Sequence, residues 1–252
     1  MSLKRVVSVV RKEVREFRRN RFVIGTMAVL PFIFLITPML TIFKIPESAS
    51  GPQVKAAVGV ISLLMLIIPI AIPPVIAAYS VVGERDQGTL EPVLTAPVRA
   101  SELLLGKAVA AFLPSVAVAY AIYFVVLISV RFGAAHVVRS VVFHPPQLLA
   151  QLLFTPLLAL WAIWVGIGIS TRASDVRVAQ QLATVAGLPL LAFTSLLSFQ
   201  LIKPSVPLAV GLALALLAVD VAAGRFVSRL FDPERLITGH RIRRTDEAPH
   251  AH

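Results

Sequence analysis

The sequence of 252 residues contains no cysteine and few charged residues. Without cysteine, disulfide bonds, thiolate metal sites and thiolate nucleophiles are all excluded. Only 15% of the residues are Asp, Glu, Lys or Arg, whereas soluble domains contain about 25%. Hydrophobic residues make up 57%, and the mean hydropathy is +0.85. Because a water-soluble protein of this size could not bury so much apolar surface, the composition predicts an integral membrane protein.

Acidic residues are fewer than basic ones. The sequence has 13 Asp and Glu and 24 Lys and Arg, which gives a formal net charge of +11. Such an excess can indicate a nucleic-acid-binding protein. Here, however, the basic residues lie between long apolar segments rather than on one soluble face. We therefore interpret the excess as the positive-inside pattern of a membrane protein and expect no nucleic-acid partner.

Long uncharged segments recur along the chain. A helix that crosses the hydrocarbon core of ~30 Å needs about 20 apolar residues. We expect an all-α membrane domain over residues 22–224, between an N-terminal segment 1–21 and a cytoplasmic tail 225–252. Its six spans are expected at about 22–43, 56–83, 108–130, 148–171, 178–202 and 204–224. The fourth is placed after His144-Pro145-Pro146, because this tripeptide predicts a helix break.

The distribution of basic residues predicts the topology. Six spans put both termini on one side of the membrane. That side would hold 19 of the 24 Lys and Arg residues. The loops on the other side would hold the remaining Lys44, Lys55, Arg131, Arg139 and Lys203. Because cytoplasmic loops are enriched in Lys and Arg, we expect cytoplasmic termini in a multi-pass protein of the cell membrane.

Residues 1–21 are typical of an amphipathic interfacial helix. Apolar side chains recur at helical spacing: Leu3, Val6, Val7, Val10, Val14 and Phe17. Basic residues occupy the other faces, and they include Arg11, Lys12, Arg15, Arg18 and Arg19. Such a helix would lie in the interface plane with its cations near anionic headgroups. The alternative is a plain positively charged flank of the first span.

Catalytic and cofactor motifs are absent from the sequence. His136 and His144 are too far apart for one helix face to bind a metal, and no carboxylate accompanies them. The segment Ser101–Ala108 resembles a phosphate-binding loop only superficially. Such a loop requires glycine at Ser101 and Ser or Thr at Ala108. We therefore expect no ATP site, no metal and no cofactor in this chain, and no enzymatic activity of its own.

Asp220 is the only acidic residue inside a predicted span. A carboxylate there is costly unless it pairs, faces the bundle interior or meets water. Three interpretations stay open: an ion pair with Arg225, Arg172 or Arg177, a polar site in a transport pathway, or a solvated helix end.

The loop 84–101 between the second and third spans is built as a short helix. Gly88 permits a turn, Thr89 suits an N-cap, Glu91 and Pro92 suit the first helical turn, and Pro97 ends the helix. A linker between two spans needs no such sequence. The loop is therefore predicted to dock into another protein.

The loop sequence E-R-D-Q-G-T-L-E-P-V-L-T-A-P-V, followed by E-L-L-L-G-K, resembles the signature loop of type-2 ATP-binding-cassette (ABC) exporter permeases. The N-terminal R-K-E-V-R-E-F-R-R-N-R, which precedes an apolar segment with Pro31, is similar to the connecting helix of that family. The tail F-D-P-E-R-L-I-T-G resembles its C-terminal end. These similarities extend over nearly the whole chain.

The resemblance implies a permease without its own nucleotide-binding domain, in which two six-span copies (a homodimer or a heterodimer) meet at a central pathway. Two separate ATPase subunits would bind ATP and magnesium, and loop 84–97 would be the coupling helix seated in the ATPase. The residues assigned to that coupling are Glu84, Arg85, Gly88, Thr89, Leu90, Glu91, Pro92 and Pro97. The segment between the last two spans is shorter than in many members, so the outer gate is not assigned.

The main functional hypothesis is therefore the transmembrane subunit of an ATP-driven exporter. Its spans carry neutral polar residues and almost no charge, which favours an amphipathic drug or a lipid as substrate over sodium or another ion. Two further alternatives are a membrane assembly factor that does not transport and an intramembrane enzyme. The latter would need converging ionisable residues at membrane depth, and the spans offer one.

Overall fold

The computed structural model describes residues 2–83, 100–173, 175–198 and 205–230. Within these ranges the fold is all-helical, without a strand. The elements in chain order are α1 (Leu3–Phe17), α2 (Arg21–Ile42), α3 (Gly51–Ala78), a π-helical turn η1 (Tyr79–Gly83), α6 (Ala100–Gly133), α7 (His136–Val142), α8 (Pro145–Ser170), α9 (Val176–Ser198) and α10 (Val206–Leu230). Six of them, α2, α3, α6, α8, α9 and α10, are long and apolar enough to cross a membrane.

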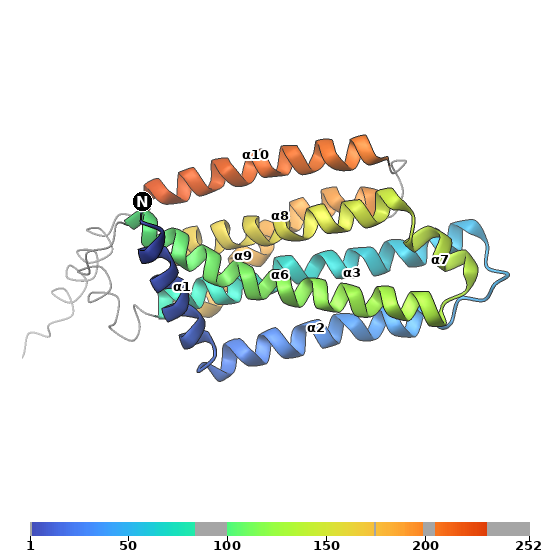
Figure 1. The fold of residues 1–252 in the computed structure, drawn as a ribbon, viewed down its shortest axis with the longest axis horizontal. Helices are drawn as coiled ribbons and strands as arrows, with labels where there is room; N and C mark the ends of the chain where they lie inside the picture. Colours follow the sequence, from blue (N-terminus) through green and yellow to red (C-terminus); the bar gives the residue numbers. More distant parts are fainter. Residues whose placement is uncertain (1, 84–99, 174, 199–204, 231–252) are drawn as a thin grey trace, which may run out of the picture.

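The six long helices run lengthwise through the molecule, with α3 among them as the central helix (Figure 1). α3 packs against α2, α6, α8 and α9, whereas α10 packs mainly against α8. Buried aliphatic side chains of α3, such as Ile61, Ile68 and Ile72, form the core. α2, α9 and α10 leave many apolar side chains exposed. A helix that is apolar all round is expected where the surrounding solvent is lipid.

Two helices begin earlier than the sequence predicts. α8 begins at Pro145 rather than at 148, because prolines fit the first helical turn, where their missing N–H would have no partner in any case. The predicted break lies at Phe143 and His144, because α7 ends at Val142 and His144 is the N-cap of α8; the two prolines already belong to α8. α6 begins at Ala100 rather than at 108 and therefore includes Glu102 and Lys107, whose side chains are buried.

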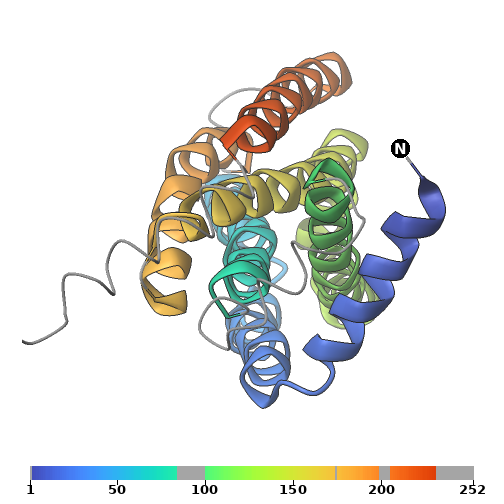
Figure 2. The same cartoon turned by 90° about the vertical axis from the view of Figure 1, so that its left-hand side faces the viewer.

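α1 lies at one end of the bundle and is steeply inclined to the long helices (Figures 1 and 2). It packs against the first part of α6 and buries Val6, Val9, Glu13 and Phe17. The two helices approach closely at Gly106, where an added Cβ atom would lie 2.5 Å from Cγ1 of Val9. The absence of a side chain at Gly106 therefore allows this packing. We call α1, η1 and the first two turns of α6 the loop end of the bundle.

Candidate functional site

The eight residues assigned to coupling lie outside the described residues: Glu84, Arg85, Gly88, Thr89, Leu90, Glu91, Pro92 and Pro97. The structure does describe the helices on both sides of their loop. η1 ends at Gly83, and α6 begins at Ala100. α6 makes polar contacts with α1, and η1 makes one with α6, so the loop end is where the candidate site can be built from described residues.

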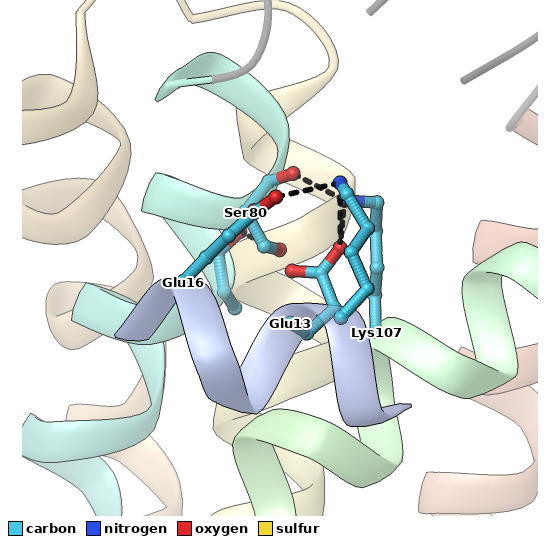
Figure 3. A network of polar contacts seen from close by, with 6 residues as sticks. Glu13, Glu16, Ser80 and Lys107 are labelled. Carbon is cyan, nitrogen blue, oxygen red and sulfur yellow. Dashed lines mark hydrogen bonds and ion pairs between the residues drawn. The ribbon is translucent and has the colours of Figure 1, made fainter. Parts of the chain in front are cut away.

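A buried ion pair connects α1 to α6. The Nζ atom of Lys107 lies 2.8 Å from Oε1 of Glu13, and it also donates a hydrogen bond to the backbone carbonyl oxygen of Ser80 in η1 (Figure 3). Lys107 and Glu13 are both 0% exposed. One ammonium group therefore joins the N-terminal helix, the helix before the loop and the helix after it.

The environment of this pair makes each partner depend on the other. Glu13 lies on the buried face of α1 with Val6, Val9 and Phe17, so its carboxylate has lost its water. A desolvated charge is tolerated where an opposite charge and further hydrogen bonds compensate it. Lys107 supplies that charge, and it also donates a hydrogen bond that the carbonyl oxygen of Ser80 accepts. Neither Glu13 nor Lys107 belongs to a motif from which a site can be predicted in the sequence.

A second buried carboxylate holds the start of α1. Oε1 of Glu102 accepts a hydrogen bond of 2.6 Å from the backbone N–H of Ser2, and Oε2 lies 3.6 Å from Nη1 of Arg5. Glu102 is 1% exposed. A carboxylate is favourable at this place because the first N–H groups of a helix carry partial positive charge. α6 therefore contacts α1 through Glu102 near its start and through Lys107 about two turns along it.

The five basic residues predicted at the membrane interface have different environments. Lys12 lies 3.2 Å from Oε1 of Glu16 and 3.6 Å from Oε1 of Glu13, so it belongs to the polar network. The side chains of the other four are exposed and form no ion pair within the described part of the chain: Arg11, Arg15, Arg18 and Arg19.

Asp220 is fully buried in α10, and neither of its carboxylate oxygens has a hydrogen-bond partner among the residues that the structure describes. The predicted ion pair with Arg225, Arg172 or Arg177 is not formed, because all three arginines are exposed and Asp220 faces inward. The solvated helix end is also excluded by the burial. The third interpretation, a polar site in a pathway, stays a prediction.

An open apolar cavity of about 890 Å³ lies between α8, α9 and α10. Its walls include Trp161, Trp164, Gly168 and Phe226, and Arg172 is its charged lining residue. Asp220 does not line it. The cavity can therefore hold an apolar or amphipathic group, and the buried carboxylate lies elsewhere. In the described ranges no three His, Cys, Asp or Glu side chains are grouped so as to hold a metal.

The family model described as "ABC-2 family transporter protein" matches residues 7–204. The match begins within α1, includes the loop and five of the six long helices, and ends before α10. A comparison with curated proteins finds no match. Since the matched segment covers well over half of the chain, the chain belongs to the ABC-2 transporter family.

Membership defines the class of the protein. It is a multi-pass membrane permease of an ABC transporter, a transmembrane component of a kind that is generally not catalytic. The family also implies association with an ABC ATPase. The polar network of α1, η1 and α6 therefore lies in the part of the permease that flanks its predicted coupling loop.

The Glu13–Lys107 pair can be tested by a double-mutant cycle. Glu13→Gln or Lys107→Met alone leaves a buried charge without its partner, which is expected to lower the free energy of unfolding by about 3–5 kcal/mol. The combined variant removes both charges and should recover most of that loss. Thermal unfolding in detergent measures all three variants. Additive losses in the combined variant would show that the two side chains do not interact.

Asp220→Asn tests whether this carboxylate is structural. Because no described group pairs with it, replacing it with a neutral side chain of the same shape removes a desolvation cost and breaks no ion pair. We expect a melting temperature equal to or above that of the wild type. A drop of several degrees would instead indicate that the charged form of Asp220 is stabilised in the folded protein.

Proposed function

We propose that the chain is the transmembrane subunit of an ATP-driven ABC exporter and that loop 84–97 docks into a separate ATPase subunit. ATP hydrolysis in that subunit would move the loop and change which side of the membrane the pathway opens to. The observation that carries the proposal is the matched ABC-2 family model over residues 7–204, which includes the loop.

The network at the loop end supports a mechanical role for this region. A force on loop 84–97 acts on η1 at one end and on α6 at the other. Both are joined to α1 by Lys107, which contacts Glu13 and the carbonyl oxygen of Ser80. A displacement of the loop would therefore be shared by α1, α3 and α6 instead of being absorbed by one flexible connection. We propose that this rigid unit transmits the motion of the ATPase to the bundle.

We propose that both termini are cytoplasmic and that α1 lies along the cytoplasmic face of the membrane. The inclination of α1 to the long helices and the exposed arginines on its outer faces support this orientation. Cytoplasmic flanks of membrane helices are enriched in such residues. The orientation also puts loop 84–97 on the side where a soluble ATPase and its ATP are found.

The substrate proposed for the exporter is an amphipathic drug or a lipid. The cavity between α8, α9 and α10 is lined mainly by apolar and aromatic side chains, which suits such a molecule. The alternative is an ion. The feature that favours it is Asp220, which is fully buried and has no hydrogen-bond partner among the described residues. A non-transporting assembly factor has no need of a coupling loop.

Glu84→Lys combined with Glu91→Lys tests the docking loop. The changes put cations where the docking surface of the ATPase is expected to meet carboxylates, and like-charge repulsion at an interface costs several kcal/mol. We expect at least about a 100-fold weaker association with the ATPase that copurifies with the wild type, at normal membrane insertion. Pull-down from detergent extracts measures the association between the permease and the ATPase.

The matched control is Asp175→Lys, which reverses the charge of an exposed residue between α8 and α9, at the same end of the bundle, and costs only the hydrogen bond from the backbone N–H of Arg177. It should leave the association unchanged. If the double variant still copurifies with the ATPase and stimulates its hydrolysis, the loop is only a connection between spans.

A further inference from the structure

A second feature near the loop end lies between α1 and the long helices. An apolar groove of about 610 Å³ runs between α1, the first turns of α2, and α6. The groove is lined by Val14, Phe17, Arg18, Ile24, Met27, Ala28, Leu113 and Pro114. Ile24 is 48% exposed and Leu113 is 55% exposed, so no part of the described chain fills the groove.

A basic cavity adjoins this groove. It has a volume of about 450 Å³ and is lined by Val14 and four arginines, Arg11, Arg15, Arg18 and Arg19. Val14 and Arg18 line both cavities, so the apolar groove and the basic cavity adjoin each other at α1. An occupant of the two would therefore need an apolar chain next to an anionic group.

The arginines are available to an anion. The acid nearest to them on α1, Glu16, is engaged by Lys12 at 3.2 Å, and none of the four arginines forms an ion pair in the described ranges. A guanidinium group binds phosphate oxygens with two parallel N–H donors. Several of them around one cavity are complementary to a phosphodiester headgroup.

The depth of the groove matches the geometry of a lipid. α2 begins at Arg21, and Ala28 lies seven residues along it, which is about 10 Å at 1.5 Å per residue. An interfacial helix lies at the boundary between headgroups and acyl chains. The groove would then hold the upper part of an acyl chain, directly beneath a headgroup bound by the arginines.

We propose that α1, α2 and α6 form a binding site for an anionic phospholipid, with the acyl chain in the groove and the phosphate between Arg11, Arg15, Arg18 and Arg19. The lipid would fill the space between α1 and the bundle and hold the loop end at the membrane surface. The site does not depend on the ATPase or on the transported substrate, so it can be tested independently of the proposed function.

The test is native mass spectrometry of the full-length protein in neutral detergent, titrated with dioleoyl phosphatidylglycerol or dioleoyl phosphatidylcholine. We expect one phosphatidylglycerol to bind at least about tenfold more tightly than phosphatidylcholine. Arg15→Gln combined with Arg18→Gln should lower the affinity for phosphatidylglycerol about 25-fold, because each basic residue contributes about fivefold. The control, Arg225→Gln with Arg229→Gln, removes two exposed charges at the end of α10 and should stay within twofold of the wild type.

Ala28→Phe distinguishes a defined lipid site from non-specific electrostatic attraction of anionic lipids to the arginines. The new side chain fills the groove, and every arginine is kept. This variant should bind phosphatidylglycerol more weakly and keep the melting temperature of the wild type. Glycerol phosphate, which has no acyl chains, should not compete with phosphatidylglycerol for the wild-type protein. Three results would overturn the proposal: equal binding of the two lipids, equal losses in the arginine variant and its control, or unchanged binding by Ala28→Phe. Normal lipid binding by the arginine variant together with lost copurification of the ATPase would instead assign the arginines to a protein interface.

Discussion

The ion pair between Glu13 and Lys107 is the interaction on which the architecture of the loop end depends. Both groups are fully buried, so neither could stay charged without the other. Their distance of 2.8 Å fixes α1 against α6, and the hydrogen bond from Lys107 to the carbonyl oxygen of Ser80 adds η1 to the same unit. Three segments that are far apart in the sequence thus share one ammonium group.

This constraint matters because packing in lipid is weakly specified by apolar contacts. Lipid chains are as apolar as the faces of α2, α9 and α10, so burial against water does not hold these helices in one arrangement. Small residues and polar contacts hold membrane helices in one arrangement. At the loop end, Gly106 permits the close approach of α1, while Glu102 and Lys107 fix its position along α6. The arrangement of the helices is therefore better determined at the polar loop end than in the apolar middle of the bundle.

The features that follow from length and periodicity could be predicted from the sequence. Apolar segments of about 20 residues are long enough to cross a membrane, and the described residues include six such helices. The uncharged span 108–130 is shorter than α6, because α6 also contains Glu102 and Lys107, whose charges have buried partners. α8 begins three residues before the predicted fourth span, because Pro145 and Pro146 fit a first helical turn.

The polar site could be predicted only in part. Glu13 follows Val6 and Val9 and precedes Phe17 at helical spacing, so its place on the buried face was readable from the periodicity. Its partner was not, because the pairing of Glu13 with Lys107 depends on how α1 crosses α6. The same reason explains Asp220: the rotation of α10 turns it inward, away from the arginines that the sequence offered as partners.

The central claim is that α1, η1 and α6 move as one unit with the coupling loop. The most direct test is the ATPase activity of the reconstituted complex when the permease carries Glu13→Gln and Lys107→Met together, a change that removes the link without leaving a buried charge unpaired. The account predicts that this permease still binds the ATPase and fails to stimulate its hydrolysis. Full stimulation with the link removed would contradict it.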